Sequence, residues 1–200
     1  MLKILKNNHG GISMFTLVIM IFLLPFAIWV GIELPKSYEM NQRVKDAVDT
    51  ASATAVTRTN GMPEDGEYIY INKSDAEKVA NQIFSSKLGV EYQGWNPTTQ
   101  EHEFQIPEQS AIKSIDKYRV RIFDPENPEE WLNRDGQKVE TISGDEKITN
   151  SSVIVEAQVT FKKIGLFGGS KDKDGNSFRT TTVTHVGISQ AVFCKGCIKP

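Results

Sequence analysis

The longest apolar stretch of the chain lies near its N-terminus. The sequence ISMFTLVIMIFLLPFAIWVGI, from Ile12 to Ile32, contains no charged residue. As a helix rising ~1.5 Å per residue it would cross the ~30 Å hydrocarbon core of a membrane, and Trp29 suits the interfacial region. A buried helix of a soluble protein is the alternative, but such helices seldom stay uncharged for this length. The pattern predicts a transmembrane helix over residues 12–32, with a bend at Pro25.

The charges on either side of this stretch predict its orientation. Lys3 and Lys6 precede it, while the charges that follow, beginning with Glu33, nearly cancel. Because basic residues favour the cytoplasmic side, we expect residues 1–11 to form a cytoplasmic tail and the rest to lie outside, in a single-pass protein of the cell membrane. A cleaved secretory signal is the alternative, but its apolar core is usually ~7–15 residues and no small-x-small site follows Ile32 closely.

A second helix is expected directly after the apolar stretch. Apolar residues recur there at three- and four-residue steps, which predicts a juxtamembrane helix over residues 33–58. Ala47, Ala51 and Ala55 follow one another at four-residue spacing. Small side chains on one face allow another helix or a sheet to approach closely, so we expect these alanines to form a packing face.

Turn residues separate this helix from a strand and a third helix. Residues 68–71, Tyr-Ile-Tyr-Ile, have the composition of a short strand. Ser74 and Glu77 have the spacing of a capping box, which predicts that a helix begins there. Its apolar face continues to Leu88, and Gly89 would end it.

The clearest strand pattern lies in the last third of the chain. Residues 153–161 alternate apolar and mostly polar side chains, and residues 178–193 are rich in threonine and β-branched residues. These segments predict two long strands paired antiparallel. Residues 93–146 are polar and interrupted by prolines, with candidate strands near residues 104–106 and 118–123, which indicates irregular sheet and loops. The expected fold class is α+β, with residues 59–200 forming an extracytoplasmic head.

Both ends of the chain carry a family resemblance. The block GGISMFTLVIMIFLLPFAIWVGIE followed by QRVKDAVDTASATAVTR resembles the TadE/TadG-like proteins of tight-adherence pilus systems. The segments VIVEAQVTFKKIGLFGG and FRTTTVTHVGISQAVF are similar to the closing strands of that family. The resemblance implies a pilin-like component, or minor pseudopilin, of a pilus or secretion assembly. It would act by structural association with other pilin-like or assembly-machinery subunits.

The resemblance also implies a possible processing site. Family members cleaved by a prepilin peptidase carry a glycine before the cleavage point and commonly a glutamate five residues in. Gly10 and Gly11 are the candidate glycines, but counting from them gives Phe15 and Thr16. TadG-like members that keep the N-terminus as an anchor match equally well.

Composition narrows the choice of partners and functions. The 200 residues allow one domain plus an anchor, and the formal net charge of -2 gives no reason to expect nucleic acid as a partner. No esterase, phosphate-loop, dinucleotide or zinc-protease motif occurs, so we expect neither an enzyme nor a cofactor. An anchored ligand-binding or scaffolding head is the second hypothesis, and an anchored enzyme the third.

Cys194 and Cys197 form a C-x-x-C pair at the end of the chain. A redox pair normally opens a helix, but only three residues follow, and no second Cys or His pair completes a zinc site. The preferred interpretation is a local disulfide, with a free or intermolecular thiol pair as the alternative.

Other polar motifs are interpreted as structural. Residues 172–176 resemble the start of a calcium loop, but the glycine and glutamate that such a loop needs are Ser177 and Val183, which favours a polar hairpin turn. Residues 124–130 are expected to be a solvated acidic loop. The histidines are too scattered to suggest a ligand set, so no metal site is predicted.

Overall fold

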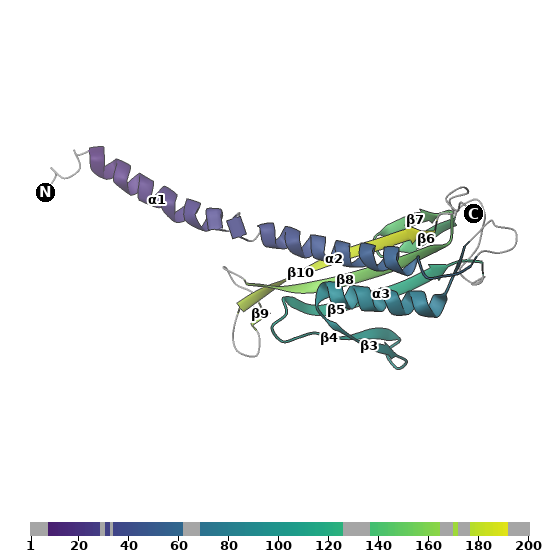
Figure 1. Cartoon of the computed structure of the whole chain (residues 1–200). Helices are drawn as coiled ribbons and strands as arrows, with labels where there is room; N and C mark the ends of the chain where they lie inside the picture. Colours follow the sequence, from purple (N-terminus) through teal and green to yellow (C-terminus); the bar gives the residue numbers. More distant parts are fainter. Residues whose placement is uncertain are drawn as a thin grey trace. The chain divides into compact units, whose positions relative to one another are not determined.

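A computed structural model describes residues 8–28, 31–32, 34–61, 69–125, 137–164, 170–171 and 177–191. The helices and strands within these residues are labelled in Figure 1. The chain divides into two compact units, Met1–Asn41 and Gln42–Pro200.

The first unit contains α1 (Asn8–Ile28), a helix of 21 residues with Pro25 inside it. The expected transmembrane helix over residues 12–32 is wrong, because no helix in the described part of the chain is long and apolar enough to cross a membrane. Four residues of α1, Asn-His-Gly-Gly, precede Ile12, and the helix ends at Ile28 rather than Ile32. The described apolar part of the helix, residues 12–28, rises about 25 Å, against the ~30 Å that a span requires.

This result also corrects the expectations that depended on a membrane span. The anchored form of the α+β fold class and the single-pass localisation in the cell membrane, with a cytoplasmic N-terminus, are wrong for the same reason. The described residues instead form three helices, several antiparallel sheets and their connections.

A four-stranded antiparallel sheet is the centre of the second unit, with strand order β5-β8-β10-β9. The expected pairing of two long C-terminal strands is confirmed, because β8 and β10 are antiparallel neighbours. Their register runs from Ser152 opposite Gln190 to Ile164 opposite Phe178. The register places Val155, Ala157 and Val159 on one face, as the alternation predicts. The strands are β5 (Ile112–Phe123), β8 (Ser152–Ile164), β9 (Ser170–Lys171) and β10 (Ser177–Gln190).

Helix α2 (Leu34–Ala55) packs its second half on this face of the sheet. Ala47, Ala51 and Ala55 are all fully buried. The approach is close enough that the backbone of Val48 touches Gly187 of β10, and the hydroxyl groups of Ser52 and Ser189 lie 3.1 Å apart. The alanine face thus lies against the sheet of the same chain. The helix ends at Ala55, three residues before the expected end.

Helix α3 (Lys73–Leu88) packs on the sheet beside β5, where the Tyr118 hydroxyl donates to Asn81 of the helix (Figure 1). Its N-cap is Asn72, whose side-chain oxygen accepts the N–H of Asp75 at 3.1 Å, so the expected capping box beginning at Ser74 is not the cap. Gly89 ends the helix in the left-handed conformation, as expected. Arg43, near the middle of α2, donates to the carbonyl of Leu88 at 3.0 Å, which links α2 to the C-terminal end of α3.

The opposite face of the sheet is covered by a hairpin, whose strands are β6 (Gln137–Thr141) and β7 (Gly144–Ile148). Val139 and Ile148 of the hairpin pack with Ile154 of β8 and Phe123 of β5 in a buried cluster. The region of residues 93–146 is therefore more regular than its polar sequence indicates. It also contains β3 (Glu91–Asn96) and β4 (Glu101–Gln105), which form a second hairpin. The candidate strands near residues 104–106 and 118–123 correspond to parts of β4 and β5.

The remaining short strands connect the helical layer to the sheet. β1 (Thr59–Gly61) pairs with β2 (Tyr70–Ile71) after α2. The carboxylate of Asp124 is buried and accepts the backbone N–H of Ile71 at 2.9 Å. The expected solvated acidic loop is thus wrong at its first residue, because this carboxylate satisfies a buried donor.

Candidate functional site

An aromatic cluster joins α3, the β3–β4 hairpin and β5. The ring of Tyr118 lies 4.4 Å from that of Phe84 and 5.1 Å from that of Phe104, measured between centroids. His102 packs its edge toward Tyr118 at 5.3 Å, and Trp95 lies 5.0 Å from His102. Alternation along β4 turns His102 and Phe104 to the same side, toward β5. The cluster fixes the hairpin beside the sheet.

Burial keeps the polar rings of this cluster neutral, and hydrogen bonds satisfy their polar atoms. The hydroxyl of Tyr92 and Nδ1 of His102 lie 2.9 Å apart, and the hydroxyl of Tyr118 donates to Oδ1 of Asn81 at 2.8 Å. Burial lowers the pKa of His102, and the carboxylate of Glu77 partly offsets this by raising it. Burial, and then Glu77, raise the pKa of Tyr92.

Tyr118 is the most strongly perturbed group of the cluster. Burial raises the pKa of its hydroxyl well above the usual value, and Tyr92 and Glu77 act in the same direction. A neutral imidazole and two protonated phenols are therefore expected at pH 7.

A buried carboxylate lies on the other face of the sheet. Glu156 of β8 is only 1% exposed, and its Oε1 accepts from Nε and Nη2 of Arg119 at 3.1 and 2.8 Å. Its Oε2 accepts the N–H of Ile142 at 2.9 Å, in the turn of the β6–β7 hairpin. Nη1 of Arg121 is 3.9 Å from the same Oε1. Glu156 thus holds both the hairpin turn and the Arg119 guanidinium in place.

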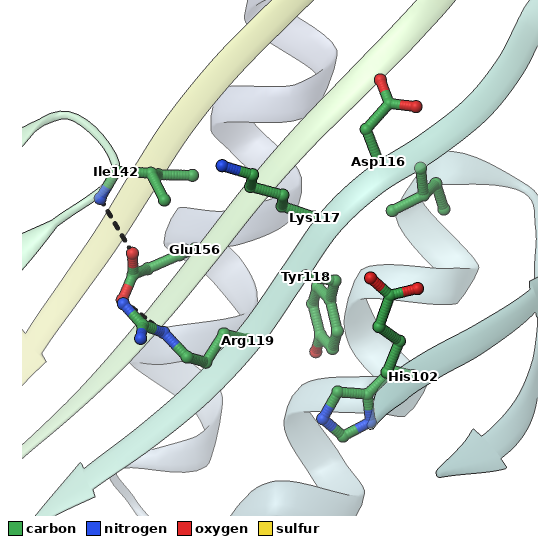
Figure 2. A pocket seen from close by; sticks show the side chains of 9 residues that line it. His102, Asp116, Lys117, Tyr118, Arg119, Ile142 and Glu156 are labelled. Atoms are coloured by element: carbon green, nitrogen blue, oxygen red, sulfur yellow. Dashed lines mark hydrogen bonds and ion pairs between the residues drawn. The ribbon is translucent and has the colours of Figure 1, made fainter. Parts of the chain in front are cut away.

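A pocket of about 280 Å³ lies along β5 between these two groups of side chains. Figure 2 shows Lys117 and Arg119 turned toward Glu156, and Tyr118 turned the other way, toward His102. This alternation follows from the strand, because successive side chains point to opposite faces. The pocket therefore opens around the outer edge of β5 onto both faces of the sheet.

A second, open hollow of about 780 Å³ continues from this pocket toward the hairpin turn. Lys117, Arg119 and Arg121 line it, opposite Glu140. Arg121 also donates to the backbone carbonyl of Glu140 at 3.0 Å. Glu140 lines the hollow as well, and Glu156 and Asp116 lie beside it, so this surface is highly charged but carries both signs.

The chemistry of this site is suited to binding. Guanidinium and ammonium groups supply donors for carboxylate or phosphate oxygens, and the aromatic cluster supplies an apolar surface beside them. Within the ranges that the structure describes, no three His, Cys, Asp or Glu side chains are placed to hold a metal ion.

The residues singled out from the sequence lie elsewhere. Gly10 and Gly11 lie within α1, and the alanine face lies under the sheet. Cys194 and Cys197, and the calcium-like segment of residues 172–176, are outside the described residues. The structure brings together only the three alanines, so processing at the glycines and a disulfide stay predictions.

The residues of the pocket were missed by reading the sequence. One signal was present, because Glu156 interrupts the apolar run VIVEAQV of β8 with a charge. A buried strand carrying one acidic residue requires a cationic partner. Arg119 and Arg121, two residues apart in the preceding strand pattern, were the candidates.

Comparison with known proteins gives no relative: no family model, no curated protein and no solved structure matches the chain. The resemblance to TadE/TadG-like proteins therefore stays a prediction. The expected membrane, pilus-assembly and secretion roles are corrected here, since no helix among the described residues can span a membrane and no match supports such a system.

Proposed function

We propose that the protein is a structural subunit that acts by association, and that copies of the chain assemble through α1. One observation carries this proposal. Of the large hydrophobic side chains that are exposed in the described residues, all but Trp95 lie between Met14 and Tyr38. An exposed apolar surface of this size marks an interaction site rather than ordinary surface.

The exposed surface extends around the helix. Phe22 is 74% exposed and Leu24 is 57% exposed. Side chains two positions apart in a helix point to nearly opposite sides, about 200° apart, so both sides of α1 are exposed. A helix that is apolar on all sides is stable only when neighbours cover all sides. One groove on one partner covers a single stripe, so several neighbours are required.

Copies of α1 fit this requirement best. From Asn8 to Ile28 the helix has no Asp, Glu, Lys or Arg that could pair with a charged partner. Identical apolar helices, packed side by side, cover one another at interaxial distances of ~8–10 Å. Repetition of one contact gives a closed ring or an open helical array.

The proposal agrees with one part of what the family resemblance implies, namely association between like subunits. It includes no membrane anchor and no pilus or secretion system. The pocket lies in the second unit and takes no part in this proposal.

Sedimentation of the full-length protein tests this proposal. The wild-type chain, with a monomer mass of 22.4 kDa, is expected to sediment as a defined larger species. Phe22→Glu places a charge on the exposed apolar surface and should shift the population toward monomer. Trp95→Glu changes the exposed tryptophan of the second unit in the same way and should leave the assembly intact.

Two results would contradict the proposal. The first is a wild-type chain that stays monomeric at high concentration. The second is a loss of assembly in Trp95→Glu with none in Phe22→Glu, which would transfer the association to the second unit.

A further inference from the structure

A bulge in the β3–β4 hairpin sets the direction of Trp95. The register of the two strands shifts between Tyr92 and Gly94, and Gly94 has a φ of 126°, a conformation that favours glycine. In an uninterrupted strand, residues three apart point to opposite faces. Here the extra residue turns Trp95 to the side of Tyr92, and their rings lie 5.0 and 5.8 Å from that of His102. The bulge therefore places the indole next to a residue that lines the pocket beside β5.

Trp95 is more exposed than a side chain of its size usually is. Its relative exposure is 54%, and within the described residues it is the only exposed large hydrophobic residue of the second unit. The indole is a flat apolar surface on which another ring, or the C–H face of a sugar, can stack. An exposed tryptophan turned by a bulge toward a pocket indicates a binding role.

The polar side chains of the pocket carry both signs of charge. Its lining includes the cations Lys117 and Arg119 and the anions Glu101, Asp116 and Glu156. A ligand of strong negative or strong positive charge would meet like charges along this lining, at a cost in affinity. The mixture of signs therefore favours a ligand without net charge.

Several donors and acceptors of this lining are not used within the part of the chain that the structure describes. The side chains of Lys117 and Glu101 are exposed and make no hydrogen bond or ion pair there. Arg119 is 53% exposed and engages Glu156 through Nε and Nη2, which leaves its Nη1 available. A hydroxyl group both donates and accepts, so a ligand rich in hydroxyl groups can use the cations and the carboxylate together.

The size and shape of the pocket fit a small ring. Its volume of about 280 Å³ lies just below the ~300–1,000 Å³ that is usual for drug-sized ligands. Figure 2 shows Tyr118 and His102 together on one side of β5, with Lys117 and Arg119 on the other. A ligand here meets an apolar aromatic side and a polar side at once. A sugar ring has the same division, with C–H faces and hydroxyl groups around its edge.

We propose that this pocket binds a short neutral oligosaccharide, with one sugar ring inside it and the next stacked on Trp95. The hydroxyl groups of the saccharide accept hydrogen bonds from Lys117 and Arg119 and donate to Glu101. Saccharide binding does not depend on association through α1, because every residue that it uses belongs to the second unit.

Calorimetric titration of the full-length protein with cellotriose, maltotriose and tri-N-acetylchitotriose tests the proposal. At least one of these neutral saccharides should bind. Trp95→Ala should weaken this binding roughly tenfold or more, whereas Trp95→Phe keeps a ring and should retain most of it. Lys117→Ala should weaken it roughly threefold to tenfold, because a hydrogen bond from a charged donor is lost. Lys45→Ala removes an exposed lysine of α2 and should leave binding unchanged.

Two further measurements keep the result interpretable. Circular dichroism should show that Trp95→Ala and Lys117→Ala are folded, since both side chains are exposed. Phe22→Glu should bind the saccharide as the wild-type chain does, so a failure of assembly and a failure of saccharide binding are distinguishable.

Other outcomes overturn the proposal. Binding of none of the three saccharides removes the site. Equal or tighter binding of a sulfated oligosaccharide or of adenosine monophosphate assigns the surface to anionic ligands. Full binding by Trp95→Ala shows that the indole does not stack on the ligand. A loss in Lys45→Ala as large as that in Lys117→Ala places the contact elsewhere.

Discussion

Gly187 of β10 lies so close to Val48 of α2 that a β-carbon on residue 187 would stand 2.4 Å from the Val48 carbonyl oxygen. The contact is between backbones, which a rotamer change cannot relieve. It sets the distance between the helix and the sheet, and it requires small side chains on the facing stripe of α2, where Ala47 and Ala51 are fully buried.

Gly187→Ala should therefore lower the free energy of unfolding by about 2–4 kcal/mol, because α2 must shift away from β10. Gly31→Ala is the matched control, since a β-carbon there meets nothing within 4 Å. Urea denaturation of both variants measures the difference. Equal stability of the two variants would contradict the close packing of α2 on β10.

Ala51→Leu tests the same interface from the helix side. Ala51 is fully buried, whereas Ala53, two residues further, is exposed. We expect Ala51→Leu to cost ~1–3 kcal/mol by overpacking, and Ala53→Leu to stay within ~0.5 kcal/mol. If the alanines instead contacted another subunit, Ala51→Leu would leave the unfolding transition unchanged and impair assembly alone.

Local patterns in the sequence predicted several elements well. The alternation of residues 153–161 defined the face of β8 that is buried, and Gly89 marked the end of α3, because these features depend on neighbouring residues. The N-cap was predicted two residues late, since Ser74 and Asn72 are both good caps. The apolar N-terminal stretch was over-interpreted, because it was counted as a helix from Ile12 to Ile32, whereas the helix that the structure describes there covers Asn8–Ile28.

The pocket could not be predicted in the same way. Glu156 and Ile142 are brought together by a hairpin that packs on the sheet, and Tyr118 meets Asn81 across 37 residues of sequence. Such contacts depend on tertiary packing. The sequence carried only a hint of them, a lone acidic residue inside an apolar strand.

Removing either partner of the Arg119–Glu156 ion pair should lower the free energy of unfolding, but by unequal amounts. Arg119→Met leaves a carboxylate that is 1% exposed without its main partner, and should cost about 3 kcal/mol of unfolding free energy. Glu156→Gln leaves a guanidinium that is half exposed and regains water, and should cost only about 1–2 kcal/mol. Chemical denaturation of the two variants checks the order. A reversed order would contradict the burial of Glu156.

The pKa of His102 gives a further test. Burial lowers it, so the imidazole should titrate below its ordinary value of about 6.5 in an NMR titration. Glu77 acts in the opposite direction, so Glu77→Gln should lower the pKa of His102 further, while Glu91→Gln serves as the control. A midpoint at or above the ordinary value, or an upward shift in Glu77→Gln, would contradict the geometry of the cluster.

The same shift makes stability depend on pH. The unfolded chain protonates its histidine at a higher pH than the folded chain, so it binds more protons below about pH 6.5. The contribution of His102 to the free energy of unfolding should therefore fall as the pH decreases from about 6.5 toward the folded pKa. His102→Gln should remove this part of the pH dependence in denaturation measured at several pH values.

Photo-crosslinking from α1 tests the central claim most directly. A benzoylphenylalanine at position 22, where the Phe22 side chain is 74% exposed, should crosslink full-length chains on illumination. Mass spectrometry of the product should join this position to residues of α1 from another copy. The same probe at position 182, exposed on β10, is the control and should give no such product. Crosslinks from position 22 that reach only the second unit, or none at concentrations where the wild-type chain assembles, would contradict association through α1.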